Sequence, residues 1–308
     1  MPTRTHRLPA TPDGQSSLVY VWQGSAPATG VVILAHGMGE HALRYEPLAQ
    51  ALVAAGFDVY ANDHRGHGQT VREASQLGDY GPEGWRGLVD DALGLARQVR
   101  TDYDVPVLIM GHSMGSMLVQ HLLTEASELY DGAALSGTTA VDVMAAASAT
   151  AGTEEESAAQ AETDLFARFN AAFEPVRTPS DWLSRDPEQV DLYVNDPLCG
   201  FSVTDDSFAS LMEAGAAYSS PEATSRIRRD LPIYLFAGDK DPVGAGGVLV
   251  AKVADRYREA GIEDVELKLY PGARHEVFNE TNREEVVRDF LVWAERVRDA
   301  AGRGSARS

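Results

Sequence analysis

The chain has 308 residues, of which 44% are hydrophobic, and carries a formal net charge of −20 at pH 7. A surface this acidic repels phosphate backbones, so nucleic acid is excluded as a main partner. The single cysteine, Cys199, permits no disulfide within the chain, so nothing here requires an oxidising compartment.

The apolar stretches are short. Runs such as VVILA have about five residues, whereas roughly 20 are needed to cross a bilayer. The first residues, MPTRTHRLPATPDGQSS, contain no apolar stretch of the kind that a signal peptide needs. We therefore expect a cytoplasmic protein without stable membrane insertion, and the sequence does not indicate its oligomeric state.

Strand and helix patterns alternate along most of the chain. After two strands joined through Asp13-Gly14, we expect strands at 31–35, 57–63, 107–110, 133–136, 233–237 and 265–270, and helices at 43–55, 87–100, 116–124 and 284–298. Several of these strands are continuous apolar runs, which is typical of strands buried on both faces. The alternation predicts an α/β fold with a mostly parallel sheet and helices on both faces.

The alternation stops between residues 138 and 228, where the sequence is rich in alanine and acidic residues, with aromatic residues in patches. We interpret this segment as an insertion into one α/β core made of residues 1–137 and 229–301. The last residues, 302–308, are small and polar, and we expect them to be disordered.

One motif combines a serine with two glycines at a junction between strand and helix. The segment PVLIMGHSMGSMLVQHLL, residues 106–123, passes from a buried strand through Gly-His-Ser-Met-Gly into a helix. A nucleophile at such a sharp turn needs small neighbours, which Gly111 and Gly115 supply. The pattern predicts Ser113 as a catalytic nucleophile.

A serine hydroxyl needs a histidine base, and the base needs an orienting carboxylate. With this motif on a parallel sheet, the acid and then the histidine follow the serine along the chain. Of the eight histidines, only His121 and His275 follow Ser113. His121 lies inside the helix after the motif and points away from its apex, whereas His275 follows the strand at 265–270, so we expect His275 to be the base.

The acid is expected in the loop GDKDPVG, which follows the strand at 233–237. Asp239 and Asp241 both lie in this loop, and their positions alone leave the choice open. The negative oxygen formed during attack needs backbone N–H donors. We expect one from Met114, directly after the nucleophile, and a second from Met38 in the glycine-containing stretch HGMGEH.

Taken together, these stretches resemble the α/β-hydrolase superfamily, and within it the monoacylglycerol lipase and lysophospholipase group, also described as serine aminopeptidase S33-like. The matching stretches between residues 36 and 280 are HGMGEH, NDHRGHGQT, GHSMGS, NDPLC, AGDKDPV and GARHEVFNE. The roles that the resemblance implies are Ser113 as nucleophile, Asp241 as acid, His275 as base and the Met38 and Met114 amides as oxyanion donors. It also implies that the insertion, residues 138–228, is a mainly helical cap over an acyl pocket. Four further residues match positions of the group, and we interpret them as loop scaffolding: Glu40, His41, Arg65 and His67.

The expected cap departs from the group in its charge. Residues 150–164 hold five acidic residues and no lysine or arginine, so the segment should dock poorly on anionic bilayers. The aromatic residues that follow, Phe166, Phe169 and Phe173, have the spacing of one helix face. They are either the cap's own core or part of the acyl-binding wall.

The predicted activity is hydrolysis of carboxylic esters, either monoacylglycerol- or lysophospholipid-like or small and neutral, through an acyl-enzyme, with no metal or organic cofactor. A peptidase or amidase with the same triad, a cofactor-free haloperoxidase or C–C hydrolase, and a non-catalytic binding protein are the alternatives. Dehalogenases and epoxide hydrolases are discounted because they need a carboxylate where Ser113 stands. The partner we expect is a small-molecule ester.

Overall fold

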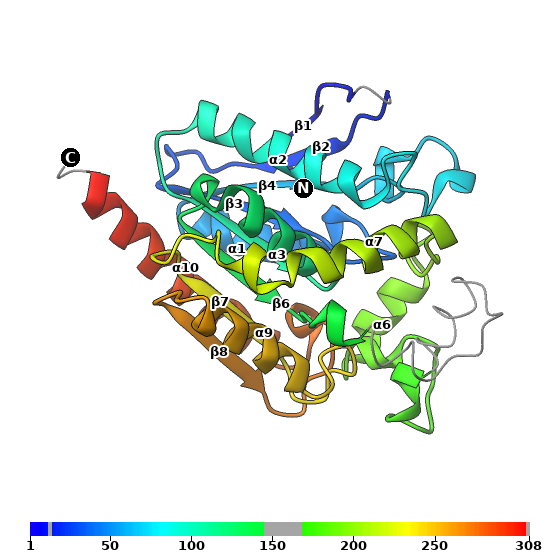
Figure 1. The fold of residues 1–308 in the computed structure, drawn as a ribbon. Helices are drawn as coiled ribbons and strands as arrows, with labels where there is room; N and C mark the ends of the chain where they lie inside the picture. Colours follow the sequence, from blue (N-terminus) through cyan, green and yellow to red (C-terminus); the bar gives the residue numbers. More distant parts are fainter. Residues whose placement is uncertain (12–13, 145–167, 306–308) are drawn as a thin grey trace.

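The computed structural model describes residues 1–11, 14–144 and 168–305, and among these an eight-stranded sheet forms the centre of the molecule (Figure 1). The strands lie in the order β1-β2-β4-β3-β5-β6-β7-β8. Their bounds are β1 Arg4–Arg7, β2 Leu18–Trp22, β3 Gly30–Ala35, β4 Phe57–Asn62, β5 Val107–His112, β6 Gly132–Ser136, β7 Ile233–Gly238 and β8 Val265–Tyr270. The β1/β2 and β2/β4 pairs are antiparallel and the remaining pairs are parallel, which confirms the predicted sheet.

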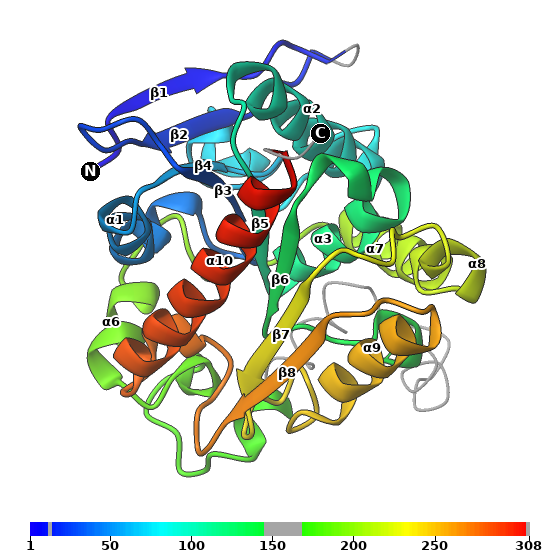
Figure 2. The same ribbon diagram turned by 90° about the vertical axis from the view of Figure 1, so that its left-hand side faces the viewer.

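Helices cover both faces of the sheet. Their bounds are α1 Glu46–Ala54, α2 Gly84–Asp102, α3 Met114–Ala126, α6 Pro187–Val194, α7 Asp205–Tyr218, α8 Pro221–Thr224, α9 Val248–Glu259 and α10 Arg283–Ser305. Apolar residues of α2, α3 and α9, such as Leu88, Leu118 and Val250, share one buried cluster with one face of the sheet. Leu52 of α1 and Phe290 of α10 belong to the cluster on the other face, where Figure 2 shows α10 running in front of the sheet with α1 beside it.

The parallel strands explain where the candidate site lies. β3, β5 and β7 are buried along their whole length, as apolar strands between two helical layers should be. Because the carboxyl ends of parallel strands meet at one edge, the loops that follow β3, β5, β7 and β8 converge there. These are the loops that carry Met38, Ser113, Asp241 and His275.

The segment between β6 and β7 carries α6, α7 and α8, and its second half packs closely on the core. Helix α7 contacts α2 and α3, and its residues Leu211 and Tyr218 belong to the same buried cluster as those helices. The acidic run and Phe166 fall within 145–167, outside the described residues.

The expected disorder of the tail, residues 302–308, stays a prediction, although α10 extends to Ser305. A glycine inside a helix costs only about 1 kcal/mol relative to alanine, so Gly302 does not have to end the helix. Residues 306–308 lie outside the described part of the chain.

Candidate active site

Ser113 stands in a strained turn between β5 and α3. Its backbone has φ 51° and ψ −122°, a conformation that side-chain-bearing residues rarely adopt. A Cβ atom on Gly111 would lie 2.2 Å from the carbonyl oxygen of Gly115, and one on Gly115 would lie 2.1 Å from that of Ala35. Both glycines are therefore required by close backbone approaches, which fix the serine at the tip of β5.

His275 and Asp241 form a buried pair. The imidazole Nδ1 lies 3.0 Å from each carboxylate oxygen of Asp241, and the two residues are 2% and 0% exposed. Because an ionised carboxylate only accepts hydrogen bonds, Nδ1 carries the proton and Nε2 is left as the basic nitrogen. The N–H of Val243 also donates to Asp241, at 2.9 Å, and holds the carboxylate in place.

The structure distinguishes Asp239 from Asp241, which their positions in the sequence alone did not. Asp239 accepts a hydrogen bond from the N–H of Gly272, at 2.7 Å, and so joins the loop after β7 to the turn after β8. Of these two aspartates, only Asp241 forms a hydrogen bond with His275 in the described part of the chain. His121 lies within α3, as expected, where it accepts a hydrogen bond from the indole of Trp85.

Ser113 and His275 border one cavity of about 500 Å³, within the range usual for small-molecule sites. Apolar side chains from several elements line it, among them Met117, Phe169, Trp182, Phe208, Leu211, Met212 and Val243. No hydrogen bond joins Ser113 to His275 in the part of the chain described, and such bonds often tighten only when substrate is bound. A second cavity, of about 570 Å³, lies beside α10, but neither Ser113 nor His275 lines it.

The backbone amides expected to bind the oxyanion border the same cavity. In the loop after β3, the N–H of Gly37 donates to Glu40 and that of Gly39 donates to His67. The N–H of Met38 between them has no hydrogen-bond partner among the described residues. Met114 is the first residue of α3, so its N–H has no acceptor within the helix. Both amides are thus free to bind a negative oxygen.

Three buried histidines support this loop. The ring of His36 lies 4.1 Å from that of His64 and 5.2 Å from that of His67, centroid to centroid. Burial lowers the pKa of His64 to about 3 and that of His67 to about 4, so both are neutral at pH 7. His67 donates from Nδ1 to the carbonyl of Arg65, and its Nε2 accepts from Gly39. This contact agrees with the prediction that His67 is loop scaffolding.

A buried ion triplet connects the loop after β3 to the residue after His275. Arg44 donates to Glu40 at 2.5 Å and makes a bidentate contact with Glu276 at 2.6 and 2.7 Å. Burial alone would raise the pKa of Glu276, but the Arg44 guanidinium lowers it to about 2. The triplet holds the two loops of the site at a fixed separation.

Replacing Arg44 by methionine should lower the free energy of unfolding by about 3 kcal/mol or more, because it leaves two buried carboxylates unpaired. Urea denaturation measures the loss. The matched control is Arg86→Met, which removes a half-exposed arginine that pairs with Asp90 and Glu125 and should cost under about 1 kcal/mol. Equal losses in the two variants would show that the triplet adds no particular stability.

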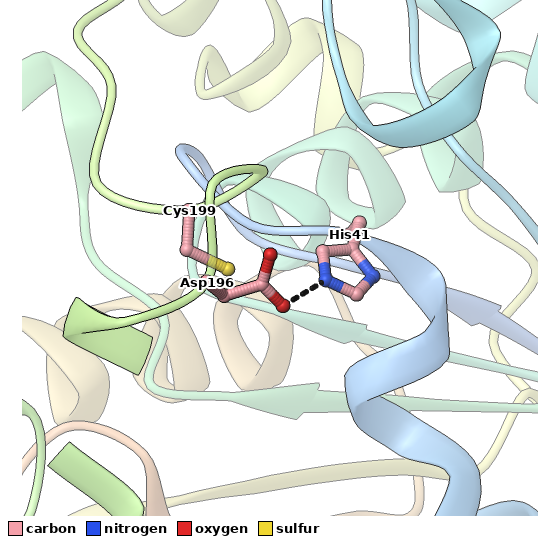
Figure 3. A group of neighbouring side chains, drawn as sticks. All are labelled: His41, Asp196 and Cys199. Atoms are coloured by element: carbon pink, nitrogen blue, oxygen red, sulfur yellow. Dashed lines mark hydrogen bonds and ion pairs between the residues drawn. The ribbon is translucent and has the colours of Figure 1, made fainter. Parts of the chain in front are cut away.

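His41, Asp196 and Cys199 lie together where the loop after β3 meets the segment before α7 (Figure 3). Their donor atoms lie within 4.8 Å of one another. His41 Nε2 is 2.9 Å from Asp196 Oδ2, while Asp196 Oδ1 accepts from the N–H of Leu198. Burial, together with the nearby carboxylates, raises the pKa of the Cys199 thiol, so forming the thiolate that a metal needs is disfavoured. We therefore interpret the group as a hydrogen-bonded link between two loops.

The aromatic residues of the predicted cap have different surroundings. Phe169 lines the cavity and packs against Trp182, with ring centroids 5.1 Å apart. Phe173 lies under the guanidinium of Arg274, 4.1 Å from its ring centroid, and is not among the cavity-lining residues described. Sequence reasoning missed Trp182, which lines the cavity beside Phe169. No periodic pattern marks it, because it comes from a single short turn.

Burial and charge act in opposite directions on the pKa of His275. Burial alone would lower this pKa, but the Asp241 carboxylate, together with Glu276 and Glu40, outweighs burial, and the net direction is upward from the ordinary 6.5. The neighbouring His112 has its pKa lowered to about 4, mainly by burial, and stays neutral when His275 gains a proton.

The rate constant kcat/KM should therefore fall as the pH drops through a single transition with its midpoint above pH 6.5. The base must be neutral to accept the serine proton, and the raised pKa keeps His275 protonated to higher pH. Measuring kcat/KM of a neutral ester between pH 5 and 9 gives the midpoint. A midpoint below pH 6.5, or a profile that stays flat down to pH 5, would assign the titration to another group.

A mostly parallel sheet with a strained nucleophile turn at its centre, and with an acid and a histidine on later loops, defines the α/β-hydrolase fold. The profile of the serine aminopeptidase S33 family matches residues 26–282, and the chain belongs to that family. This confirms the resemblance and the fold class predicted from the sequence.

Relatives with known names support the same group. The chain is 33% identical to the monoacylglycerol lipase of Mycolicibacterium smegmatis over 285 residues, 91% of this chain and 93% of that protein. It is 29% identical to the monoglyceride lipase of Mus musculus, over 95% and 91% of the two chains. A carboxyl esterase structure from Bacillus coagulans superposes with a TM-score of 0.84 at 28% identity, covering 96% and 99%. These similarities confirm the predicted class of ester-cleaving serine hydrolase.

None of the described helices is long and apolar enough to cross a membrane.

Proposed function

We propose that this protein hydrolyses neutral carboxylic esters with an apolar acyl chain, of the monoacylglycerol type, through an acyl-enzyme on Ser113. The observation that carries the proposal is the buried Asp241–His275 pair, whose histidine borders the same apolar cavity as the strained Ser113. Relatives named as monoacylglycerol lipases support the substrate class.

In the proposed mechanism, His275 Nε2 accepts the hydroxyl proton of Ser113 as the oxygen attacks the ester carbonyl. The Met38 and Met114 N–H groups donate to the resulting oxyanion. Asp241 keeps the proton on Nδ1 and stabilises the imidazolium. His275 then gives the proton to the departing alcohol, and water, deprotonated by the same nitrogen, releases the acid and restores Ser113.

The cavity wall is mainly apolar, which suits the acyl chain of an ester better than the charged amine of a peptide. An aminopeptidase needs a free carboxylate to bind the substrate's amine. Of the three glutamates that line the cavity, Glu40 and Glu276 are paired with Arg44, whereas Glu174 is exposed and accepts a hydrogen bond from the N–H of Val176. A substrate amine could therefore pair only with Glu174 among these three, and a comparison of esters with aminoacyl-nitroanilides decides between the two classes. The insertion, residues 138–228, would serve as the cap, since it supplies Phe169, Trp182 and Phe208 to the wall. A cytoplasmic location stays a prediction from the sequence.

A panel of esters graded by acyl length tests the proposal, with monoacylglycerols, lysophospholipids and aminoacyl-nitroanilides included. We expect monoacylglycerols to have the highest kcat/KM and the nitroanilides to be at least about 100-fold slower. Neutral esters should exceed anionic ones because the chain carries a net charge of −20. Faster turnover of the nitroanilides would assign the site to peptide chemistry instead.

A further inference from the structure

The turn η5, Asp181–Leu183, is hydrogen-bonded residue by residue to the loop of His275. The N–H of His275 donates to the carbonyl of Trp182 at 3.4 Å, and the N–H of Glu276 donates to that of Leu183 at 2.7 Å. The guanidinium of Arg274 donates to the carbonyls of Asp181 and Ser184, at either end of the turn. Although it lies in the segment predicted as a cap, the turn is fixed to the histidine loop.

This turn places the indole of Trp182 against the imidazole. The ring centroids of Trp182 and His275 are 5.0 Å apart, and the two planes meet at 32°. Trp182 is 8% exposed, and its backbone N–H donates to the side-chain oxygen of Asn170 at 2.9 Å. The backbone of Trp182 is therefore held both by the histidine loop and by the segment that carries Phe169, which fixes where its indole lies.

We propose that Trp182 is a positioning residue for His275, one that holds the imidazole against Asp241 and stabilises the imidazolium formed at each proton transfer. The inference rests on the proposed function, in which His275 is the base. A cation close to an indole face is attracted by the ring quadrupole, and more strongly where water is excluded. Precise orientation of the base adds to this effect, because small displacements of catalytic groups slow reactions strongly.

A second ring, that of His112, also lies against the imidazole of His275, but it does not stabilise the imidazolium as the indole of Trp182 does. His112 lies 4.7 Å from His275 between centroids and is held at Nδ1 by the hydroxyl of Ser136. It presents a smaller ring with no comparable π face for a cation. The titratable groups that act on His275 are Asp241 after β7, His112 at the end of β5, Glu276 on its own loop and Glu40 after β3.

The kinetic test compares Trp182→Phe and Trp182→Leu with Phe169→Leu as the matched control. Phe169 lines the same cavity and contacts Trp182, but no ring contact joins it to His275 among the described residues. We expect Trp182→Leu to lower kcat about tenfold with a smaller change in KM, and Trp182→Phe to keep most of kcat. Phe169→Leu should mainly raise KM. An unchanged kcat in Trp182→Leu, with only KM raised, would overturn the inference.

A spectroscopic test needs no turnover and is done in the Ser113→Ala background. An imidazolium quenches the fluorescence of an indole in contact with it, so emission should fall as His275 gains its proton below a midpoint above pH 6.5. Trp182→Phe should abolish this transition. Trp85→Phe, which removes the indole that donates to His121, should retain it. A transition that persists in Trp182→Phe would contradict the contact.

The outcomes of these tests are separate from those of the proposed function. If Trp182→Leu keeps full kcat while His275→Ala is inactive, the proposed base stands and the role of Trp182 is wrong. If His275→Ala retains activity, the proposed function itself fails.

Discussion

Replacement of Ser113 by alanine is expected to lower kcat/KM for p-nitrophenyl esters by about 10⁴-fold or more. The hydroxyl oxygen is the only protein atom in the proposed mechanism that bonds to the acyl carbon, and losses of this size are typical when a serine nucleophile is removed. Steady-state kinetics on the purified variant measure the change. Folding should be unaffected, since the substitution removes one oxygen at a half-buried position that faces the cavity.

Ser116→Ala serves as the matched control. Ser116 lies one helical turn further on, and its hydroxyl donates to the carbonyl of Ser113. The substitution therefore removes a hydroxyl near the site but leaves the nucleophile in place. We expect this variant to keep activity within about tenfold, as the loss of one hydrogen bond is worth about 1 kcal/mol. Wild-type turnover in Ser113→Ala would rule out the acyl-enzyme mechanism.

The second large effect is expected from Asp241→Asn, with a loss of about 10⁴-fold in kcat. An asparagine amide does not hold the proton on Nδ1 of His275 or stabilise the imidazolium, so the imidazole takes the wrong tautomer. The measurement is kcat at a pH well above the midpoint of His275, where the wild-type base is neutral.

Asp239→Asn is the matched control two residues away. Asp239 accepts a single hydrogen bond from Gly272, and an asparagine oxygen accepts it equally well, so kcat should change less than about threefold. If Asp239→Asn were the inactive variant and Asp241→Asn the active one, the acid would be assigned to the wrong carboxylate.

The sheet and the placement of the site were predictable from the sequence because they depend on local patterns. Continuous apolar runs such as 31–35 mark strands buried on both faces, and parallel strands bring the loops after them to one edge. Gly111 and Gly115 point to the nucleophile turn because a Cβ at either position meets backbone atoms at about 2 Å. These signals are independent of distant parts of the chain.

The contacts that refine the site depend on distant residues and left no local signal. Arg44 pairs with Glu276 across 232 positions of sequence, so neither residue indicates the other. Trp182 reaches His275 only because backbone hydrogen bonds join two loops from different parts of the chain. The choice between Asp239 and Asp241 likewise depends on where the loop after β7 meets the turn after β8.

The most direct test of the account is to identify, by mass spectrometry of peptides, the residue that a fluorophosphonate probe modifies. The proposed chemistry predicts one adduct, on Ser113, which forms rapidly in the wild-type protein and is lost or greatly slowed in His275→Ala. An adduct on a different serine, or equal labelling of Ser113 without His275, would contradict it.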